Sequence, residues 1–516
     1  MPTIEKMNRF FSLLLIGFGW VLVSAQTPAK VVPAEQAKPS LPRLTQALQA
    51  KLDQSRTRAK FPGAQVGFVF VEGQSPDGAA RYRSGSVATG FADLQTNTSL
   101  KTSDRLLAGS IGKTFVAALT MLLVQDGKLN LDEKIERWLG NETWFAKLPN
   151  AKDITLRMLL NHSSGIPNHV DEPRFLKAVL KGGNQDIKYE ELVGFVLNKK
   201  PLFAAGRGYS YADTNYILVG LIVEKVTGKK LYEQIIDRIL KPNGLDRTIP
   251  SDAITLPEVA NGYLDGKPVI VKGKFTINPQ WEWAGGGFAS TAEDLARWAT
   301  LLYGGRILSE TSLEQMMSST TVGEGADYGL GVMTTPSKWG KSIGHDGEFP
   351  GYLSDMRYYP KYQLAVVFMV NFDQTKELNS LLSSAVDDFA GVIIGEISPH
   401  RLSTENQAKL QQLTEHWLNL IDTGKYPESW ERLTAKLKAN HPQQTWRATL
   451  HPVREKVGNF KSRKLKGISY SDPQTETVVV DFETSFSKFA NASERVVLEL
   501  ENGDWHVASY SIHYDH

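Results

Sequence analysis

The hydrophobic positions of the first three quarters of the chain predict strands at both ends and helices between them. Leu44, Leu48 and Leu52 recur at four-residue steps, which predicts one face of a helix that ends near Arg58. The other segments with a clear pattern are predicted strands at 66–71, 81–90, 356–359 and 364–370, and predicted helices at 115–123, 216–226 and 291–302. This order predicts an α+β fold, in which the first and last strands meet in one antiparallel sheet and the helices pack against it.

The pattern changes near residues 398–400, and we place a domain boundary between 395 and 404. One helical face runs from Leu410 to Ile421 and ends at Gly424. Further predicted elements are helices at 429–438 and 443–454 and strands at 477–482, 495–500 and 505–510. These elements predict a small α+β domain at 404–516, which is large enough to fold alone.

Residues 1–25 have the three-part layout of a secretory signal peptide. Lys6 and Arg9 precede an apolar run at 10–23, and Ala25 is the small residue expected at a cleavage site. The alternative is an uncleaved membrane anchor, but the run is shorter than the roughly 20 residues that a span needs. We therefore predict cleavage after Ala25, a linker at 26–43 that contains four prolines, and a periplasmic or secreted protein without a membrane span.

Composition narrows the classes of function. The 516 residues include 58 lysines and arginines and 56 aspartates and glutamates, a net charge of +2, and 41% of the residues are hydrophobic. This apolar share is typical of a globular protein and too high for a disordered one. The balanced charge argues against a nucleic-acid partner, which would require a basic excess. The absence of cysteine from the sequence excludes disulfides, thiolate metal sites and a cysteine nucleophile.

Ser110 and Lys113 are a candidate nucleophile and its activating group. Side chains three residues apart on a helix share a face, with about 5–6 Å between their Cβ atoms. The lysine can lower the pKa of the serine hydroxyl or, when neutral, accept its proton, and amides at the helix start can stabilise an oxyanion. The same spacing recurs at Ser485 and Lys488 in a strand pattern, where the side chains would not share a face, so the spacing alone is not specific.

Two later segments supply further candidate groups. Tyr211 and Asp213 precede a predicted helix, and a phenol near a lysine can be partly ionised and relay a proton from the serine to the leaving group. The imidazole of His345 could hydrogen-bond that relay or a substrate oxygen, and Gly347 lets the backbone approach closely. Each of these residues, taken alone, is more often a packed structural side chain.

In this order, Ser110-Ile-Gly-Lys113, Tyr211-Ala-Asp213 and His345-Asp-Gly resemble the signature of the serine penicillin-recognising clan. The chain resembles the class C β-lactamase-like branch, which includes DD-carboxypeptidases, esterases and D-amino-acid peptidases. The segments similar to further stretches of that family are 159–166, 213–220 and 284–295. The resemblance covers residues 44–395 and implies a serine hydrolase domain with an α/β sandwich of the β-lactamase/transpeptidase kind, with acyl-enzyme chemistry and neither metal nor cofactor.

The same resemblance implies a role for each matching residue. Ser110 would be the acylated nucleophile, Lys113 its activating partner and Tyr211 the proton relay. His345 would stand where the clan often has lysine. The backbone amides of Ser110 and Glu348 would form the oxyanion hole, within a substrate-binding stretch at 346–348 opposite position 213.

Two departures from the family pattern bear on the substrate. Asp213 stands where the family usually has asparagine, which orients Lys113 and the substrate amide, and an ionised carboxylate cannot donate a hydrogen bond. It would also hold Lys113 charged, which favours Tyr211 as the base. Asp346, followed by Glu348, replaces the threonine of a strand that meets the carboxylate of β-lactams, so repulsion should weaken carboxylate ligands. Neutral esters, amides or peptides with a free amine fit this site better.

The predicted C-terminal domain carries no comparable signal. Its six histidines lack metal-ligand spacing, and its tryptophans fit a core or a groove lining. The segment resembles a small domain of unknown function from secreted bacterial proteins, of the cone-shaped nuclear-transport-factor-like type. That resemblance implies a binding or spacer role, with a possible protein or ligand partner.

These observations predict an exported serine hydrolase that forms an acyl-enzyme at Ser110 and cleaves an ester or peptide bond of a small molecule. It would be of the esterase or D-amino-acid peptidase and carboxypeptidase type. One alternative is a true β-lactamase. An alternative of another class is a non-catalytic binding or scaffold protein that kept the fold and lost turnover.

Overall fold

The computed structural model describes most of the chain after residue 40. The predicted signal peptide, most of the predicted linker and the residues at the centre of the predicted domain boundary lie outside the described part. Within that part, no helix is both long and apolar enough to cross a membrane. The described residues are 41–74, 80–182, 188–318, 320–321, 327–373, 376–397, 404–472, 477–501 and 503–514.

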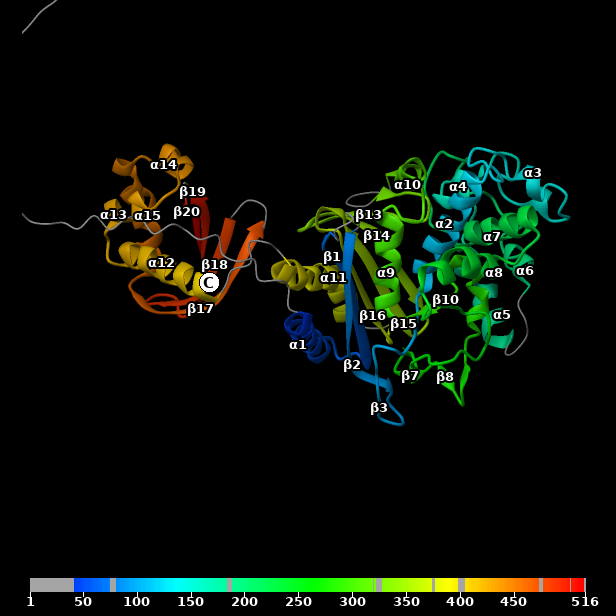
Figure 1. Ribbon diagram of the computed structural model, residues 1–516, viewed down its shortest axis with the longest axis horizontal. Helices are drawn as coiled ribbons and strands as arrows, with labels where there is room; N and C mark the ends of the chain where they lie inside the picture. Colours follow the sequence, from blue (N-terminus) through cyan, green and yellow to red (C-terminus); the bar gives the residue numbers. More distant parts are fainter. Residues whose placement is uncertain are drawn as a thin grey trace, which may run out of the picture. The chain divides into compact units, whose positions relative to one another are not determined.

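A nine-stranded antiparallel sheet organises the larger part of the molecule (Figure 1). Its strands follow the order β11-β12-β13-β14-β15-β16-β1-β2-β3. The predicted meeting of the first and last strands is confirmed, because β1 pairs with β16 and sets Val66 opposite Phe368. The strands are β1 (Gly63–Gln74), β2 (Ala80–Asp93), β3 (Thr98–Ser99), β11 (Thr320–Thr321), β12 (Asp327–Tyr328), β13 (Met333–Ser337), β14 (Gly340–Phe349), β15 (Tyr352–Tyr359) and β16 (Leu364–Val370).

The two faces of this sheet bury different hydrophobic clusters. Val66, Phe68 and Phe70 alternate along β1 and pack on one face against α1 (Leu41–Ala59) and α11 (Lys376–Ile397). The opposite face is covered by α9 (Ala292–Tyr303), as Figure 1 shows. Helix α9 approaches so closely that a Cβ on Gly67 would lie 2.2 Å from the Ala292 backbone, which explains a glycine inside a central strand.

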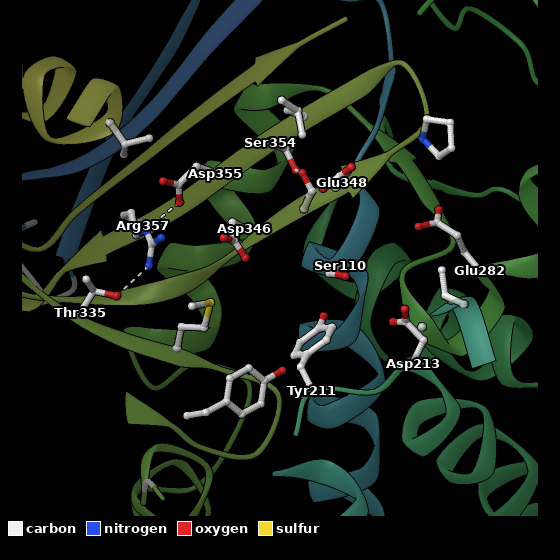
Figure 2. Close-up of a pocket in the computed structure, with 18 of the residues that line it drawn as sticks. Ser110, Tyr211, Asp213, Glu282, Thr335, Asp346, Glu348, Ser354, Asp355 and Arg357 are labelled. Carbon is white, nitrogen blue, oxygen red and sulfur yellow. Dashed lines mark hydrogen bonds and ion pairs between the residues drawn. The ribbon is translucent and has the colours of Figure 1, made fainter. Parts of the chain in front are cut away.

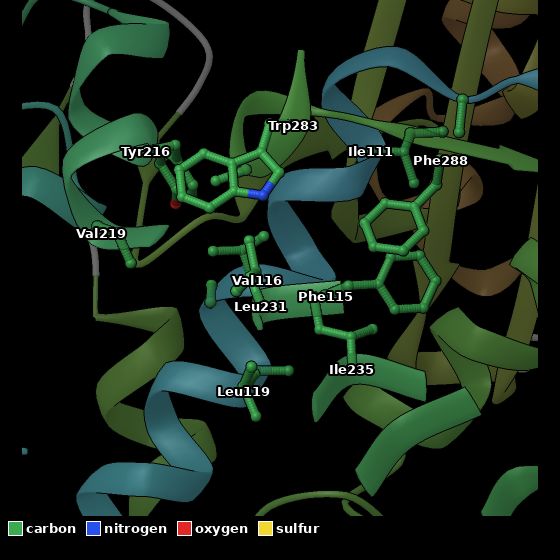
Figure 3. Packing of buried hydrophobic residues seen from close by; sticks show 14 of the residues in the cluster. Ile111, Phe115, Val116, Leu119, Tyr216, Val219, Leu231, Ile235, Trp283 and Phe288 are labelled. Atoms are coloured by element: carbon green, nitrogen blue, oxygen red, sulfur yellow. The ribbon is translucent and has the colours of Figure 1, made fainter. Parts of the chain in front are cut away.

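The helices between the strands surround the buried helix α2 (Gly112–Gln125). Its Phe115 ring stacks on Trp298 with ring centroids 4.3 Å apart, and Val116 and Leu119 are fully buried (Figure 3). Close packing of this kind holds the start of α2 in one position. The other helices of this region are α3 (Glu136–Leu139), α4 (Leu156–Leu160), α5 (Pro173–Gly182), α6 (Tyr189–Val193), α7 (Asp213–Thr227), α8 (Leu231–Ile235) and α10 (Glu310–Met317).

Short strands complete the connections of this region. A three-stranded sheet has the order β4-β10-β5, and two hairpins pair β6 with β7 and β8 with β9. These strands are β4 (Leu106–Leu107), β5 (Ile249–Pro250), β6 (Tyr263–Leu264), β7 (Lys267–Pro268), β8 (Ile270–Val271), β9 (Lys274–Phe275) and β10 (Phe288–Ser290).

The C-terminal part forms a separate hydrophobic cluster between helices and a four-stranded antiparallel sheet of order β17-β18-β19-β20. The prediction of a single helix at 429–438 is wrong. The first helix ends before Arg432, and the Thr434 side chain caps the start of a second helix. Strand β17 was not predicted. The elements are α12 (Thr404–Asp422), α13 (Tyr426–Glu431), α14 (Ala435–Asn440), α15 (Gln443–Val457), β17 (Phe460–Asp472), β18 (Thr477–Phe486), β19 (Ala492–Glu501) and β20 (Asp504–Tyr514).

Two arginines and two acidic residues form a buried ring of ion pairs in this C-terminal part. Glu494 accepts from Arg454 at 2.9 Å and from Arg463 at 2.6 Å. Asp422 lies 3.0 Å from Arg463 and also pairs with Arg454. Burial opposes ionisation of Glu494, but its charged and hydroxyl neighbours, Arg463 first, hold the pKa of that carboxyl below its ordinary value. The ring joins two helices to two strands.

Candidate active site

Ser110 lies where the helical region meets the large sheet. It belongs to the 3₁₀ turn η1 (Gly109–Ile111), between β4 and α2. The turn touches β14 through backbone alone, since a Cβ on Gly109 would lie 2.5 Å from the Glu348 amide nitrogen and one on Gly347 would lie 2.0 Å from the Ala108 carbonyl oxygen. The amides of Ser110 and Glu348 are therefore brought to the same edge of the site, as an oxyanion hole requires.

Lys113 is fully buried and has three hydrogen-bond acceptors around its ammonium group. Its Nζ lies 2.9 Å from Ser110 Oγ and 2.5 Å from the Gly285 carbonyl oxygen, and it forms an ion pair with the Asp213 carboxylate. An ammonium group has three hydrogens, so these contacts use all of them. Ser110 Oγ accepts from Lys113 Nζ and has its own proton left to donate elsewhere.

Tyr211 presents a protonated phenol to Ser110. Its hydroxyl points toward Ser110 and, in the described part of the chain, has no hydrogen-bond partner in good geometry (Figure 2). Burial and the Asp213 carboxylate raise the pKa of Tyr211 well above its ordinary value, and the Ser110 side chain offsets this only in part. The expectation of a partly ionised phenol is therefore wrong, because burial and then the Asp213 charge disfavour the phenolate, although Lys113 Nζ lies 4.7 Å from the Tyr211 ring centroid.

His345 was expected to hydrogen-bond the Tyr211 relay. It lies behind Tyr211 instead, and its two ring nitrogens bond Tyr328 and Asp346. Its side chain is 1% exposed, and its ring centroid is 6.1 Å from that of Tyr211. Nε2 lies 2.9 Å from the Tyr328 hydroxyl and Nδ1 lies 2.5 Å from the Asp346 carbonyl oxygen. Burial, only partly offset by Asp346, lowers the pKa of His345 to about 4, so the imidazole is neutral near pH 7.

The bond to Tyr328 belongs to a directed chain of hydrogen bonds. His162 Nδ1 accepts from the Ala212 amide and the Asn215 side chain, each at 3.2 Å, so the His162 proton lies on Nε2. That nitrogen is 3.2 Å from the Tyr328 hydroxyl, which then donates to His345 Nε2. The chain fixes both imidazole tautomers and supports the wall behind Tyr211. His162 falls in the family-like segment at 159–166, whereas no local pattern marks Tyr328.

The cavity over Ser110 has a volume of about 920 Å³ and an acidic lining (Figure 2). Asp213 lies at one end, and Asp346 and Glu348 project from one face of β14 on the other side of Ser110. The predicted residues Ser110, Tyr211, Asp213, Asp346, Gly347 and Glu348 all line it, whereas Lys113 and His345 lie beneath its surface.

Four charged residues of this lining were not predicted, namely Glu282, Asp355, Arg357 and Asp387. Glu282 comes from a loop segment between two 3₁₀ turns, and Asp355 pairs with Arg357 on β15 at 2.6 Å. Burial raises the pKa of Asp355 to about 6, although Arg357 opposes this shift. The pair lines the same cavity as Asp346 and Glu348. Because Arg357 already pairs with Asp355, it offers little attraction to an anionic ligand.

A serine bonded to a buried lysine, a tyrosine facing both and two amides at one edge define a serine hydrolase of the β-lactamase/transpeptidase class. Residues 44–388 are matched by the family described as Beta-lactamase, and the chain belongs to that family. Residues 413–510 are matched by the family described as Protein of unknown function (DUF4019).

The chain is similar to several characterised proteins over this region. It is 27% identical over 338 residues to Penicillin-binding protein 4* of Bacillus subtilis, which covers 58% of this chain and 67% of the relative. It is 26% identical to the D-aminopeptidase of Brucella anthropi over 55% of this chain, and it spans about half (53%) of that relative.

Solved structures extend the comparison. A D-stereospecific amidohydrolase from Streptomyces sp. is 26% identical with a TM-score of 0.55, over 66% of this chain and 98% of that one. The octameric penicillin-binding protein homologue from Pyrococcus abyssi covers 91% of this chain and 96% of its own, with a TM-score of 0.56 and 21% identity, a likeness that concerns the fold alone.

Proposed function

We propose that the protein cleaves amide or ester bonds of small substrates through an acyl-enzyme at Ser110. The observation that carries this proposal is the fully buried Lys113 ammonium, which lies 2.9 Å from Ser110 Oγ and is fixed by Asp213 and Gly285. A cation beside the hydroxyl stabilises the alkoxide that forms as Ser110 attacks the carbonyl carbon. Lys113 stays charged throughout this step.

Tyr211 moves the proton. The Ser110 proton passes to the Tyr211 oxygen while the Tyr211 proton passes to the leaving nitrogen or oxygen, so the phenol remains neutral and the C–N or C–O bond breaks. Water then attacks the ester formed with Ser110 by the reverse route. A relay of this kind needs a protonated phenol, and burial of Tyr211 supplies one. The amides of Ser110 and Glu348 would hold the oxyanion.

The charge of the cavity favours amides without a nearby carboxylate. Asp346 and Glu348 face the space beyond Ser110, so an anionic substrate group would meet repulsion there. The relatives named above as a D-aminopeptidase and a D-stereospecific amidohydrolase support an amide substrate. We therefore place the protein among amidases and peptidases of the D-amino-acid type before esterases and before true β-lactamases.

The remaining parts of the proposal concern export and the second domain. The predicted signal peptide at 1–25 supports a periplasmic or secreted location. The described residues of the C-terminal domain form a buried core and a ring of ion pairs, and we propose a binding or spacer role for this domain.

Hydrolysis of p-nitrophenyl esters and p-nitroanilides by the wild type and by Ser110→Ala tests the proposal. We expect the variant to lose turnover and to lose the covalent mass adduct that a slow acylating ester leaves on the wild type. Its unfolding midpoint should stay unchanged, because the hydroxyl contributes little to stability. Equal residual rates in both proteins would contradict the proposal.

The two alternatives have their own outcomes in this experiment. Faster Ser110-dependent turnover of nitrocefin than of the esters and anilides would identify a β-lactamase. A folded wild type with neither turnover nor adduct would favour the non-catalytic binding protein. Loss of folding in Ser110→Ala would make Ser110 a structural residue of η1.

A further inference from the structure

Glu282 is a carboxyl group that the catalytic steps do not use. It lines the cavity beside Ser110 and Asp213, yet only 5% of it is exposed (Figure 2). Its Oε2 atom has no hydrogen-bond partner in the described part of the chain. A buried polar atom without a partner is costly to retain, by about 1–3 kcal/mol. Such an atom at the wall of a cavity points to a ligand group that completes it.

Glu282 and Asp213 lie against consecutive glycines of one backbone turn. A Cβ on Gly285 would lie 3.3 Å from Asp213 Oδ1, and a Cβ on Gly286 would lie 3.0 Å from Glu282 Oε1. Burial, followed by the charge of Asp213, raises the pKa of the Glu282 carboxyl well above its ordinary value, and Lys113 offsets this only in part. Asp213 is therefore committed to its ion pair with Lys113, and the Glu282 carboxyl beside it loses its proton less readily than an ordinary carboxyl.

A cation would complete this pair. A primary ammonium group between the two carboxyls donates to both and favours the ionised form of Glu282. Lys113 cannot supply this charge, because its three hydrogens already bond Ser110, Asp213 and Gly285. The cation must therefore come from the ligand.

The position of Asp213 fixes where the ligand carries its cation. The Lys113 ammonium touches both Asp213 and Ser110 Oγ, so a group bound at Asp213 lies close to a carbonyl carbon attached to Ser110. An ammonium on the carbon next to that carbonyl meets this condition. Beside Glu282 the cavity wall is apolar, formed by Phe175 and Trp281 with ring centroids 5.3 Å apart.

We propose that Asp213 and Glu282 form an ammonium subsite, which selects amides and esters of α-amino acids that have a free amino group and an apolar side chain. This inference rests on the proposed function only for the position of the scissile bond. Binding of the amine itself does not require turnover.

The first test compares the p-nitroanilides of D- and L-phenylalanine with the p-nitroanilide of 3-phenylpropionic acid, which lacks the amino group. We expect the wild type to have a higher kcat/KM for the substrates with an amino group. Glu282→Gln should reduce the ratio of the two kcat/KM values about 10- to 100-fold, which corresponds to the loss of one charge-assisted hydrogen bond. Glu190→Gln is the matched control, since it makes the same substitution at an exposed glutamate outside the cavity lining and should change the preference less than about threefold. An equal loss on both substrates in Glu282→Gln, or a wild type that prefers the amine-free anilide, would overturn the subsite.

The second test separates the subsite from catalysis. Calorimetry would measure 2-phenylethylamine binding to Ser110→Ala, with and without Glu282→Gln, and 3-phenylpropanol would serve as the neutral analogue. Amine binding that depends on Glu282 would support the subsite even if the wild type shows no Ser110-dependent turnover, a result that would refute the proposed function alone. Absence of amine binding to Ser110→Ala would overturn the subsite whatever the turnover.

A third measurement needs no variant at position 282 and decides the matter if Glu282→Gln does not fold. The groups that face Glu282 are Asp213, Lys113 and the Tyr232 phenol. Because burial and Asp213 raise the pKa of Glu282 and a bound ammonium would lower it, amine binding to the wild type should release protons in the pH range where Glu282 titrates. Calorimetry in two buffers of different ionisation enthalpy measures that release, and its absence would contradict the pairing of Glu282 with the ammonium.

Discussion

Replacing Tyr211 by phenylalanine should stabilise the protein while it removes most of the activity. The substitution deletes one buried oxygen without a partner in good geometry and keeps the ring, which packs on His162 with ring centroids 4.3 Å apart. Removing an unsatisfied buried hydroxyl recovers up to about 1–3 kcal/mol of unfolding free energy. In a domain of this size that corresponds to a rise of roughly 2–4 °C in Tm for each kcal/mol. Loss of the proton relay should lower kcat about 10²- to 10⁴-fold with little change in KM.

Urea unfolding and steady-state kinetics on the same preparation would check both halves of this prediction. Tyr209→Phe is the matched control, because Tyr209 lines the same cavity, and we expect its kcat to stay within about threefold of wild type. A Tyr211→Phe protein that is less stable than wild type would show that the hydroxyl is bonded in solution. A kcat within threefold of wild type would refute the relay and return the base role to Lys113.

Three further predictions concern buried contacts within each domain taken by itself. Glu494→Gln leaves two buried arginines with one acidic partner and should cost about 3–5 kcal/mol in urea unfolding, whereas Asp481→Asn, in an exposed ion pair of the same sheet, should cost about 0–1 kcal/mol. Because the folded pKa of Glu494 is depressed, its contribution is present above the unfolded value of about 4.3 and should disappear as pH falls through the folded value, which an acid titration by circular dichroism would show. Gly347→Ala places a Cβ 2.0 Å from the Ala108 carbonyl oxygen, so it should displace η1 and abolish acylation, as mass spectrometry would detect.

The elements that the sequence predicts best are those whose apolar period matches one packing surface. The strand at 66–71 and the helix at 115–123 lie in β1 and α2, because each buries its regular face in a large cluster. Ser110 and Lys113 could be predicted because side chains three residues apart on a helix lie on one face. The distance of 2.9 Å between Lys113 Nζ and Ser110 Oγ agrees with that argument.

What the sequence could not predict is which way the residues of β14 face and which distant residues approach the site. Asp346 and Glu348 face the cavity while His345, one residue away, faces the opposite side of β14, since side chains alternate along a strand. The face could be assigned only once the pairing of β14 was known. Glu282 lies in an irregular turn, and Tyr328 reaches His345 across strands, so neither has a local period that marks it.

One substitution relative to the family pattern, Asp213 for asparagine, accounts for several features of the site together. The Asp213 carboxylate forms an ion pair with Lys113 and adds to burial in raising the pKa of Tyr211 and the pKa of Glu282. In the proposed mechanism proton transfer uses a neutral phenol, and in the proposed subsite the same carboxylate binds a positive ligand group. An asparagine at this position could do none of the three, because it carries no charge. The proposed relay and the proposed ammonium subsite both depend on the Asp213 charge, so Asp213→Asn should weaken both at once.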